Sequence, residues 1–267
     1  MFPPTLPNEN PRCGEAPAAM PANTSRRSVA PSSDSFINRK GSLTAVRRTI
    51  LIVLACAALA GCGGGGHSSS TSGPPDALLH PATLNTKSPQ LFTVVFKTTK
   101  GEFVVDVHRT WAPLAAQRFY NLVKAHFFDG VEFFRVVPKF VVQFGISPYP
   151  QVSKAWQNAT ITDDDVTVEN TRGAVTFASA GPNTRTTQVF INLGDNSSLD
   201  HTGFAPFGAV VSGMDVVDKL YSGYGDTPTA KQGEIEAQGN AWLKKNYPKL
   251  DSIETARVTD ESNPALP

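Results

Sequence analysis

The stretch from Phe133 to Gly145 constrains the fold of this chain more than any other part of the sequence. It reads FFRVVPKFVVQFG and holds Arg135 and Gln143 in an otherwise mostly apolar run. A run of this length with alternating bulky residues predicts a buried strand, a bend near Pro138 and a second strand. An unpaired buried charge is costly, so we expect Arg135 either to have an ionic partner or to face a cleft.

The segments on either side of this run predict a mainly β domain with short helices. Alternating residues in 91–98 and 102–107, separated by a Lys-Gly turn, predict a hairpin. Pro113 occupies the first turn of a helix that we expect to run to about residue 125. Later segments predict a short amphipathic helix over 212–220, a short helix or turn region over 237–249, and a last strand over 253–258 that pairs with the first strand.

Three segments together carry a family resemblance. They are FFRVVPKFVVQFG at 133–145, FASAGPNTRTTQVFI at 177–191 and LDHTGFAPFG at 199–208. In this order and spacing they resemble the cyclophilin family of peptidyl-prolyl cis-trans isomerases, over roughly residues 91–258. The resemblance implies a mainly β fold, a closed eight-stranded antiparallel β-barrel capped by two α-helices, and isomerase activity on proline-containing polypeptides.

The resemblance also implies roles for individual residues. Arg135 matches the catalytic guanidinium, and Gln143 matches the glutamine that hydrogen-bonds the substrate backbone. Nine further positions match the substrate-binding surface: Phe140, Val141, Phe177, Ala178, Ser179, Gln188, Phe190, Leu199 and Phe204.

The sequence departs from the family pattern at several positions. Phe134 replaces the motif histidine, and Phe144-Gly145-Ile146 replaces Gly-Gly-Asp, so we expect the loop after the motif to run differently. Ser198 stands where many members have an aromatic residue. These changes leave open a second hypothesis, a catalytically weak cyclophilin-fold module or chaperone that binds proline peptides. A barrel with an interior ligand is disfavoured, because the 16 phenylalanines would fill it.

The N-terminal part predicts export and lipid anchoring. We interpret 1–61 as a disordered extension plus a lipoprotein signal peptide, 62–88 as a flexible Gly/Ser/Pro tether and 89–267 as the isomerase domain. The ending Leu-Ala-Gly-Cys at 59–62 looks like a bacterial lipobox, which implies lipidation of Cys62. The alternative is an ordinary signal peptide with a chance cysteine. The lipid would attach the protein to the cell envelope, with the periplasmic side of the outer membrane favoured.

Composition narrows the remaining possibilities for partners and cofactors. The net charge of +1 gives no indication of nucleic-acid binding, and we expect a monomer. All three cysteines precede residue 63, so the predicted domain has neither a disulfide nor a cysteine-bound metal. Asp163–Asp165 lacks the alternating spacing of a calcium loop and predicts a solvated acidic loop. We therefore expect no metal and no cofactor.

Overall fold

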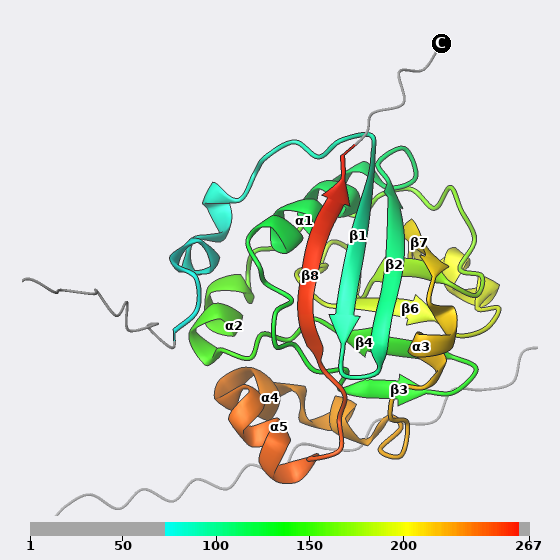
Figure 1. The fold of residues 1–267 in the computed structure, drawn as a ribbon. Helices are drawn as coiled ribbons and strands as arrows, with labels where there is room; N and C mark the ends of the chain where they lie inside the picture. Colours follow the sequence, from blue (N-terminus) through cyan, green and yellow to red (C-terminus); the bar gives the residue numbers. More distant parts are fainter. Residues whose placement is uncertain (1–72, 262–267) are drawn as a thin grey trace, which may run out of the picture. The chain divides into compact units, whose positions relative to one another are not determined.

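The computed structural model describes residues 73–261, which form a strongly curled antiparallel sheet with helices around it (Figure 1). The sheet has eight strands in the order β3-β4-β6-β5-β7-β2-β1-β8. The strands are Leu91–Thr98 (β1), Gly101–His108 (β2), Arg135–Val137 (β3), Val141–Phe144 (β4), Ala174–Phe177 (β5), Val189–Asn192 (β6), Pro206–Ser212 (β7) and Ile253–Asp260 (β8). The predicted hairpin, the paired strands around Pro138 and the pairing of the last strand with the first are confirmed.

The two end strands of the sheet, β3 and β8, are linked by the residues just before β3, which pair with the start of β8. Glu132 and Ser252 form an isolated antiparallel bridge. Gly130 donates its N–H to the carbonyl of Ile253 over 2.8 Å, and Ile253 donates to the carbonyl of Val131 over 2.8 Å. The eight-stranded antiparallel fold is thus confirmed, but this short junction, not a β3–β8 ladder, links the two ends of the sheet.

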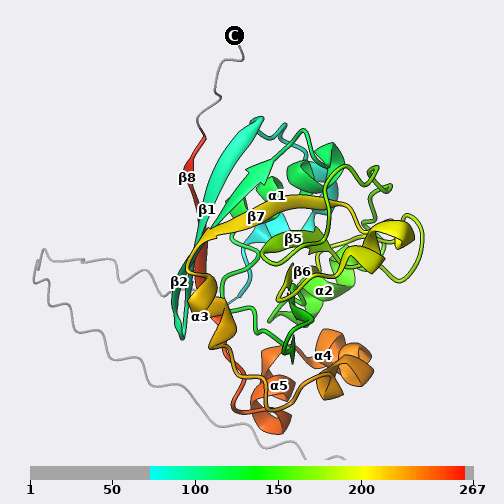
Figure 2. The same cartoon turned by 90° about the vertical axis from the view of Figure 1, so that its right-hand side faces the viewer.

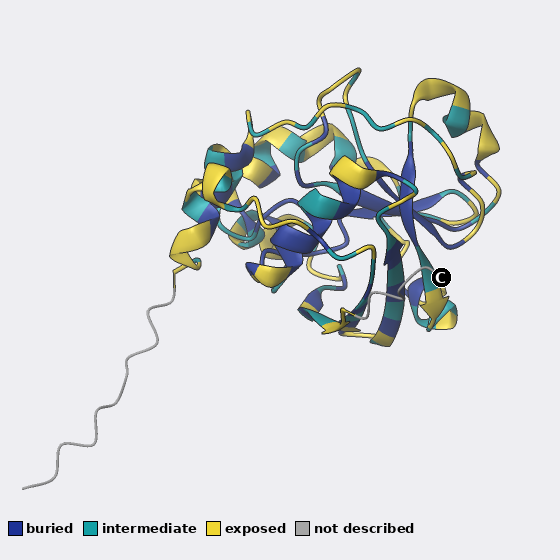
Figure 3. Cartoon of the chain, turned by 90° about the horizontal axis from the view of Figure 1, so that it is seen from above, coloured by how far each residue is buried: buried dark blue, intermediate teal, exposed yellow. Residues whose placement is uncertain are grey.

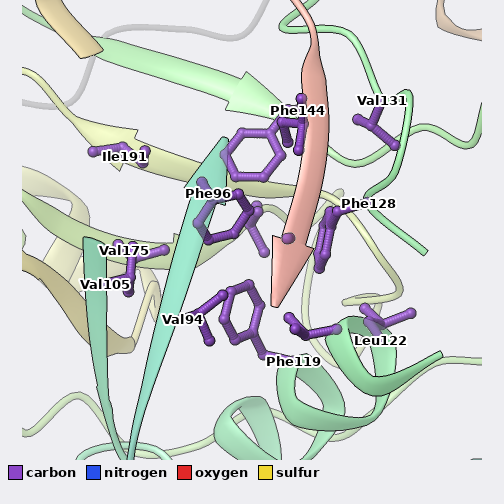
Figure 4. Close-up of a cluster of buried hydrophobic side chains, with 14 of the residues drawn as sticks. Val94, Phe96, Val105, Phe119, Leu122, Phe128, Val131, Phe144, Val175 and Ile191 are labelled. Atoms are coloured by element: carbon purple, nitrogen blue, oxygen red, sulfur yellow. The ribbon is translucent and has the colours of Figure 1, made fainter. Parts of the chain in front are cut away.

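Aromatic side chains fill the inside of the curled sheet. The rings of Phe96 and Phe103 stack with centroids 4.7 Å apart, and Phe96 also meets Phe144 edge to face at 6.0 Å. Figure 4 shows Phe119 of the first helix pointing toward Val94 and Phe96 of β1. Along β1 and β2, buried residues alternate with mostly half-buried ones, as expected for strands with one face on the core. Figure 3 shows buried residues gathered toward the inside and exposed ones toward the outside.

Helix α1 (Pro113–Lys124) begins at the predicted proline and covers part of this core. Its first N–H groups are capped by a distant carboxylate, because Asp164 accepts hydrogen bonds from the backbone of Leu114 and Ala115 at 2.9 and 3.0 Å. The same carboxylate pairs with Arg185, whose side chain is 2% exposed. The prediction of a solvated acidic loop is therefore wrong for Asp164, since the carboxylate compensates buried donors.

The other helices are short, and some of them were not predicted. Helix α3 (Met214–Asp218) and helix α5 (Asn240–Asn246) lie inside segments where the sequence predicts helix. Helix α2 (Pro150–Trp156) and helix α4 (Gln232–Gln238) do not. Four 3₁₀ turns complete the described part: η1 (Asp76–Leu79), η2 (Pro81–Thr83), η3 (Ser197–Thr202) and η4 (Thr227–Lys231). Both views place α4 and α5 together at one end of the curled sheet (Figures 1 and 2).

The folded part begins before the predicted boundary at residue 89. Leu78 is 1% exposed and belongs to the main core, and its carbonyl accepts a hydrogen bond from Trp156 Nε1 over 2.8 Å. Asn121 of α1 exchanges two hydrogen bonds with the backbone of Thr86. The predicted flexible tether over 62–88 is thus wrong for its last part, because Leu78 finds an apolar site that local composition does not reveal.

The predicted signal peptide and Cys62 lie outside the described residues. Within 73–261, none of the helices has the length and apolar character needed to cross a bilayer.

Candidate active site

Strands β3 and β4 bring the two predicted catalytic residues side by side. Arg135 and Gln143 are directly paired in the antiparallel register, so their side chains leave the same face of the sheet. Arg135 Nη1 donates a hydrogen bond to Gln143 Oε1 over 3.0 Å. The turn that joins the strands holds Lys139 at φ 65°, in the left-handed region. Because the chain reverses there, Arg135 and Gln143 face each other although they are eight residues apart in the sequence.

The hydrogen bond between Arg135 and Gln143 belongs to a longer chain of side chains. Gln143 Nε2 donates to Gln188 Oε1 over 2.9 Å, and Gln188 Nε2 donates to Gln232 Oε1 over 3.0 Å. Gln143 and Gln188 each accept one bond and donate the next, and Gln232 accepts the last one, so the chain fixes the orientation of these side chains. Gln188 precedes β6, whereas Gln232 begins α4.

Arg135 has two further neighbours. Its guanidinium carbon lies 5.4 Å from the centre of the Phe140 ring, and its Nε lies 2.5 Å from Asp226 Oδ1. No acceptor is aligned with the buried Nε–H, so the contact with Asp226 is an ion pair and not a well-directed hydrogen bond. Both expectations for Arg135 are therefore met: it has an ionic partner, and it lines a cavity.

This cavity has a volume of about 250 Å³ and a largely apolar wall. The rings of Phe190 and Phe204 meet edge to face with centroids 5.8 Å apart. Nine of the predicted residues line it: Arg135, Phe140, Val141, Gln143, Ala178, Ser179, Phe190, Leu199 and Phe204. Thr229 and Gln232 complete the wall, although no motif marks them in the sequence.

Buried asparagines hold this wall from behind. Asn196 Nδ2 donates to the carbonyl of Phe140 over 2.9 Å and also to Asn192 Oδ1 over 2.7 Å. Asn170 Nδ2 donates to the carbonyl of Phe204 and to Asp200 Oδ1, each over 2.7 Å. Because Asn192 also donates to Asn170 Oδ1, one satisfied network fixes both aromatic sides of the cavity. Sequence reasoning missed it, since scattered asparagines have no periodicity.

A second, more polar cavity of about 500 Å³ adjoins the first, and the two share Gln143, Ala178, Ser179 and Gln232. Gln188 lines this second cavity. Glu236 also faces it, and burial raises the pKa of this carboxyl group. An extended chain could therefore place one side chain in the apolar cavity and the next in the polar one.

Phe177 is the one predicted residue that lines neither cavity. Its side chain is 0% exposed and packs on Phe207 with ring centroids 5.1 Å apart. In residues 73–261 the structure has no cluster of three or more histidine, cysteine or acidic side chains that could hold a metal ion.

The arrangement offers an apolar cavity beside a cationic donor. Comparisons with known proteins show the family of the chain. A family model described as "Cyclophilin type peptidyl-prolyl cis-trans isomerase/CLD" matches residues 93–240. A peptidyl-prolyl cis-trans isomerase of Acinetobacter baylyi is 32% identical over 169 residues, which cover 61% of this chain and 88% of the relative.

Two further relatives extend the comparison. The peptidyl-prolyl cis-trans isomerase B of Escherichia coli is 32% identical over 168 residues, which cover 60% of this chain and 94% of that protein. A crystal structure of a Cryptosporidium parvum cyclophilin type isomerase has 17% identity and a TM-score of 0.48, and the match covers 64% of this chain and 98% of that one. The family match spans more than half of the chain, and the bacterial relatives are matched along most of their length. The chain therefore belongs to the cyclophilin-type peptidyl-prolyl cis-trans isomerases.

Proposed function

We propose that this isomerase acts by electrostatic stabilisation of a twisted X–Pro amide, with Arg135 as the stabilising group. Rotation about the X–Pro bond breaks amide resonance, at a barrier of about 20 kcal/mol. As the bond twists, the prolyl nitrogen becomes pyramidal and regains its lone pair. A guanidinium fixed beside that nitrogen stabilises the twisted form more than either planar form, which is the condition for catalysis.

One observation carries this proposal: the hydrogen bond from Arg135 Nη1 to Gln143 at the wall of the apolar cavity. The cavity would hold the proline ring, and Gln143 would bind the substrate backbone. The other amino nitrogen of Arg135, Nη2, has no hydrogen-bond partner in the described residues and stays available to the prolyl nitrogen. No covalent bond is made or broken, so the reaction needs no metal and no cofactor.

The test is cis-to-trans exchange of an Ala-Pro-Phe peptide by wild type and by Arg135→Ala. We expect the variant to lose about 10²- to 10³-fold in kcat/KM, as for other fixed electrostatic donors. Lys154→Ala removes a positive charge from the exposed end of α2 and should leave the rate unchanged. Full activity of Arg135→Ala would refute the proposed mechanism. A wild type that binds the peptide without accelerating exchange would favour the binding module or chaperone.

We further propose that the protein works as a monomer in a bacterial cell envelope, lipid-anchored through Cys62, on exported proline-containing polypeptides. The lipobox-like sequence at 59–62 supports this placement, and the composition gives no support for nucleic-acid binding. Two or three acyl chains together would give stable anchoring. Labelled palmitate should enter the full-length protein in a bacterial host and not Cys62→Ser, which should leave the membrane fraction. Equal labelling of the two proteins would refute the anchor.

A further inference from the structure

The segment between α3 and β8 builds a small second core of its own. Ile235 of α4 and Leu243 of α5 are buried against Phe134 and Ile146. Phe134 and Ile146 are two of the positions where the sequence departs from the family pattern. A histidine and an aspartate at these positions could not bury themselves in this way without hydrogen-bond partners. The apolar residues Phe134 and Ile146 therefore provide the surface on which α4 and α5 pack.

This packing carries two polar side chains to the active site. Asp226, at the N-terminal end of η4, reaches Arg135 Nε, and Gln232, at the start of α4, reaches Gln188. The chain of polar contacts thus runs from Asp226 through Arg135, Gln143 and Gln188 to Gln232. Its first and last members come from one short segment.

Internal contacts hold that segment in shape. Thr229 Oγ1 donates to Asp226 Oδ1 over 3.2 Å, and the N–H of Thr229 donates to the carbonyl of Asp226 over 3.0 Å. Thr229 also lines the apolar cavity. The carboxylate that meets Arg135 is therefore oriented by a residue that is itself part of the cavity wall.

We infer that Asp226 and Gln232 are positioning residues for the isomerase reaction, and that they hold the Arg135–Gln143–Gln188 chain in its reactive orientation from its two ends. This inference rests on the proposed role of Arg135. Neither residue needs to touch the prolyl amide. Asp226 acts through Arg135, and Gln232 acts through Gln188.

A carboxylate beside Arg135 has two opposing effects. It fixes the guanidinium, which favours catalysis, and it reduces the positive potential at the prolyl nitrogen, which opposes catalysis. The Asp226 side chain is 63% exposed, so water weakens the long-range effect of its charge. The carboxylate nevertheless contacts Nε directly, at 2.5 Å. Its effect on the orientation of the guanidinium therefore outweighs its effect on the potential at the prolyl nitrogen. Removal of the carboxylate should therefore slow the enzyme.

The experiment compares Asp226→Asn, Asp226→Glu and Gln232→Ala with wild type in the full chain. We expect Asp226→Asn and Gln232→Ala each to lower kcat by about fivefold, near the upper limit for one exposed pair, with KM unchanged within twofold. Asp226→Glu should recover most of the rate. Glu234→Gln is the matched control, because Glu234 is a carboxylate of the same segment that pairs with Lys231 on the surface.

A spectroscopic measurement separates positioning from general stability. In ¹⁵N-arginine-labelled protein, the Nε–H signal of Arg135, assigned by its absence in Arg135→Ala, should exchange faster with water in Asp226→Asn. It should be unchanged in Glu234→Gln. Unchanged kcat and exchange in Asp226→Asn, while Arg135→Ala is inactive, would overturn this inference and leave the mechanism intact. An active Arg135→Ala would instead remove the mechanism itself.

Discussion

At the scale of single residues, Glu132 links the fold to pH. Glu132 is 5% exposed, and burial raises the pKa of its carboxyl group to about 7. The positive charge of Lys244 lowers this pKa, but by less than burial raises it. In the unfolded chain the pKa is near 4.5. The neutral form is thus favoured by folding. The contribution of Glu132 to stability is greatest below pH 4.5 and is lost as the pH rises to about 7.

Glu132→Gln should therefore be less sensitive to pH than wild type. The full shift would correspond to about 3 kcal/mol, and partial solvation reduces the expected difference to about 2 kcal/mol. Urea unfolding at pH 5 and pH 8 measures this difference. The free energy of unfolding of the variant should increase relative to that of wild type as the pH rises. Glu254→Gln, at an exposed position of β8, should follow wild type. Parallel pH curves for Glu132→Gln and wild type would contradict the assignment.

At the scale of elements, one carboxylate joins a helix to a distant loop. Asp164 caps the first turn of α1 and, together with Asp163, compensates the buried charge of Arg185. Asp164→Ala should lower the free energy of unfolding by about 3 kcal/mol, since it removes a helix cap and half of a buried ion pair. Asp165→Ala, at the exposed neighbour, should cost less than about 0.5 kcal/mol. Equal losses for the two variants, measured by urea unfolding, would contradict the capping role.

The second core predicts a cost for restoring the family residue. Phe134→His places a polar ring against Ile235 and Leu243, where its nitrogens lack water. We expect a loss of about 2–3 kcal/mol and faster amide hydrogen exchange in α4 and α5 than in β1 and β2. Val211→His, at a side chain that is 56% exposed, serves as the surface control. Undiminished protection of α4 and α5 in Phe134→His would show that Phe134 does not hold them.

At the scale of the whole molecule, the folded unit includes residues before the first strand. A chain that begins at residue 73 should keep the stability of the full-length protein. A chain that begins at residue 89 should lose about 3 kcal/mol, because it exposes the site of Leu78, leaves Trp156 Nε1 without an acceptor and removes both hydrogen bonds between Asn121 and Thr86. Thermal and urea unfolding of the two shortened chains measure this. Equal stability would place the boundary at 89 after all.

Much of the fold was predictable because its signals are local. Alternating residues specify β1 and β2, and Pro113 specifies the start of α1. Helices α2 and α4 were missed because a short helix needs a clear apolar pattern to be recognised: α2 begins with proline and buries only Val152 and Trp156, and α4 contains Gly233 and buries only Ile235. The polar network behind the cavity was missed for a different reason. Its members are satisfied by one another and by backbone carbonyls of distant segments, so their burial cannot be read from any single segment.

The strand pair that carries Arg135 and Gln143 follows from local sequence, because a bend after Val137 brings two residues of one short run face to face. The groups that surround Arg135 depend instead on tertiary packing. Asp226 meets it through the docking of α4 and α5 onto Phe134 and Ile146, a contact between segments far apart in the chain. Local propensity fixes strands and turns within a few residues, whereas ion pairs between distant segments depend on how the cores pack.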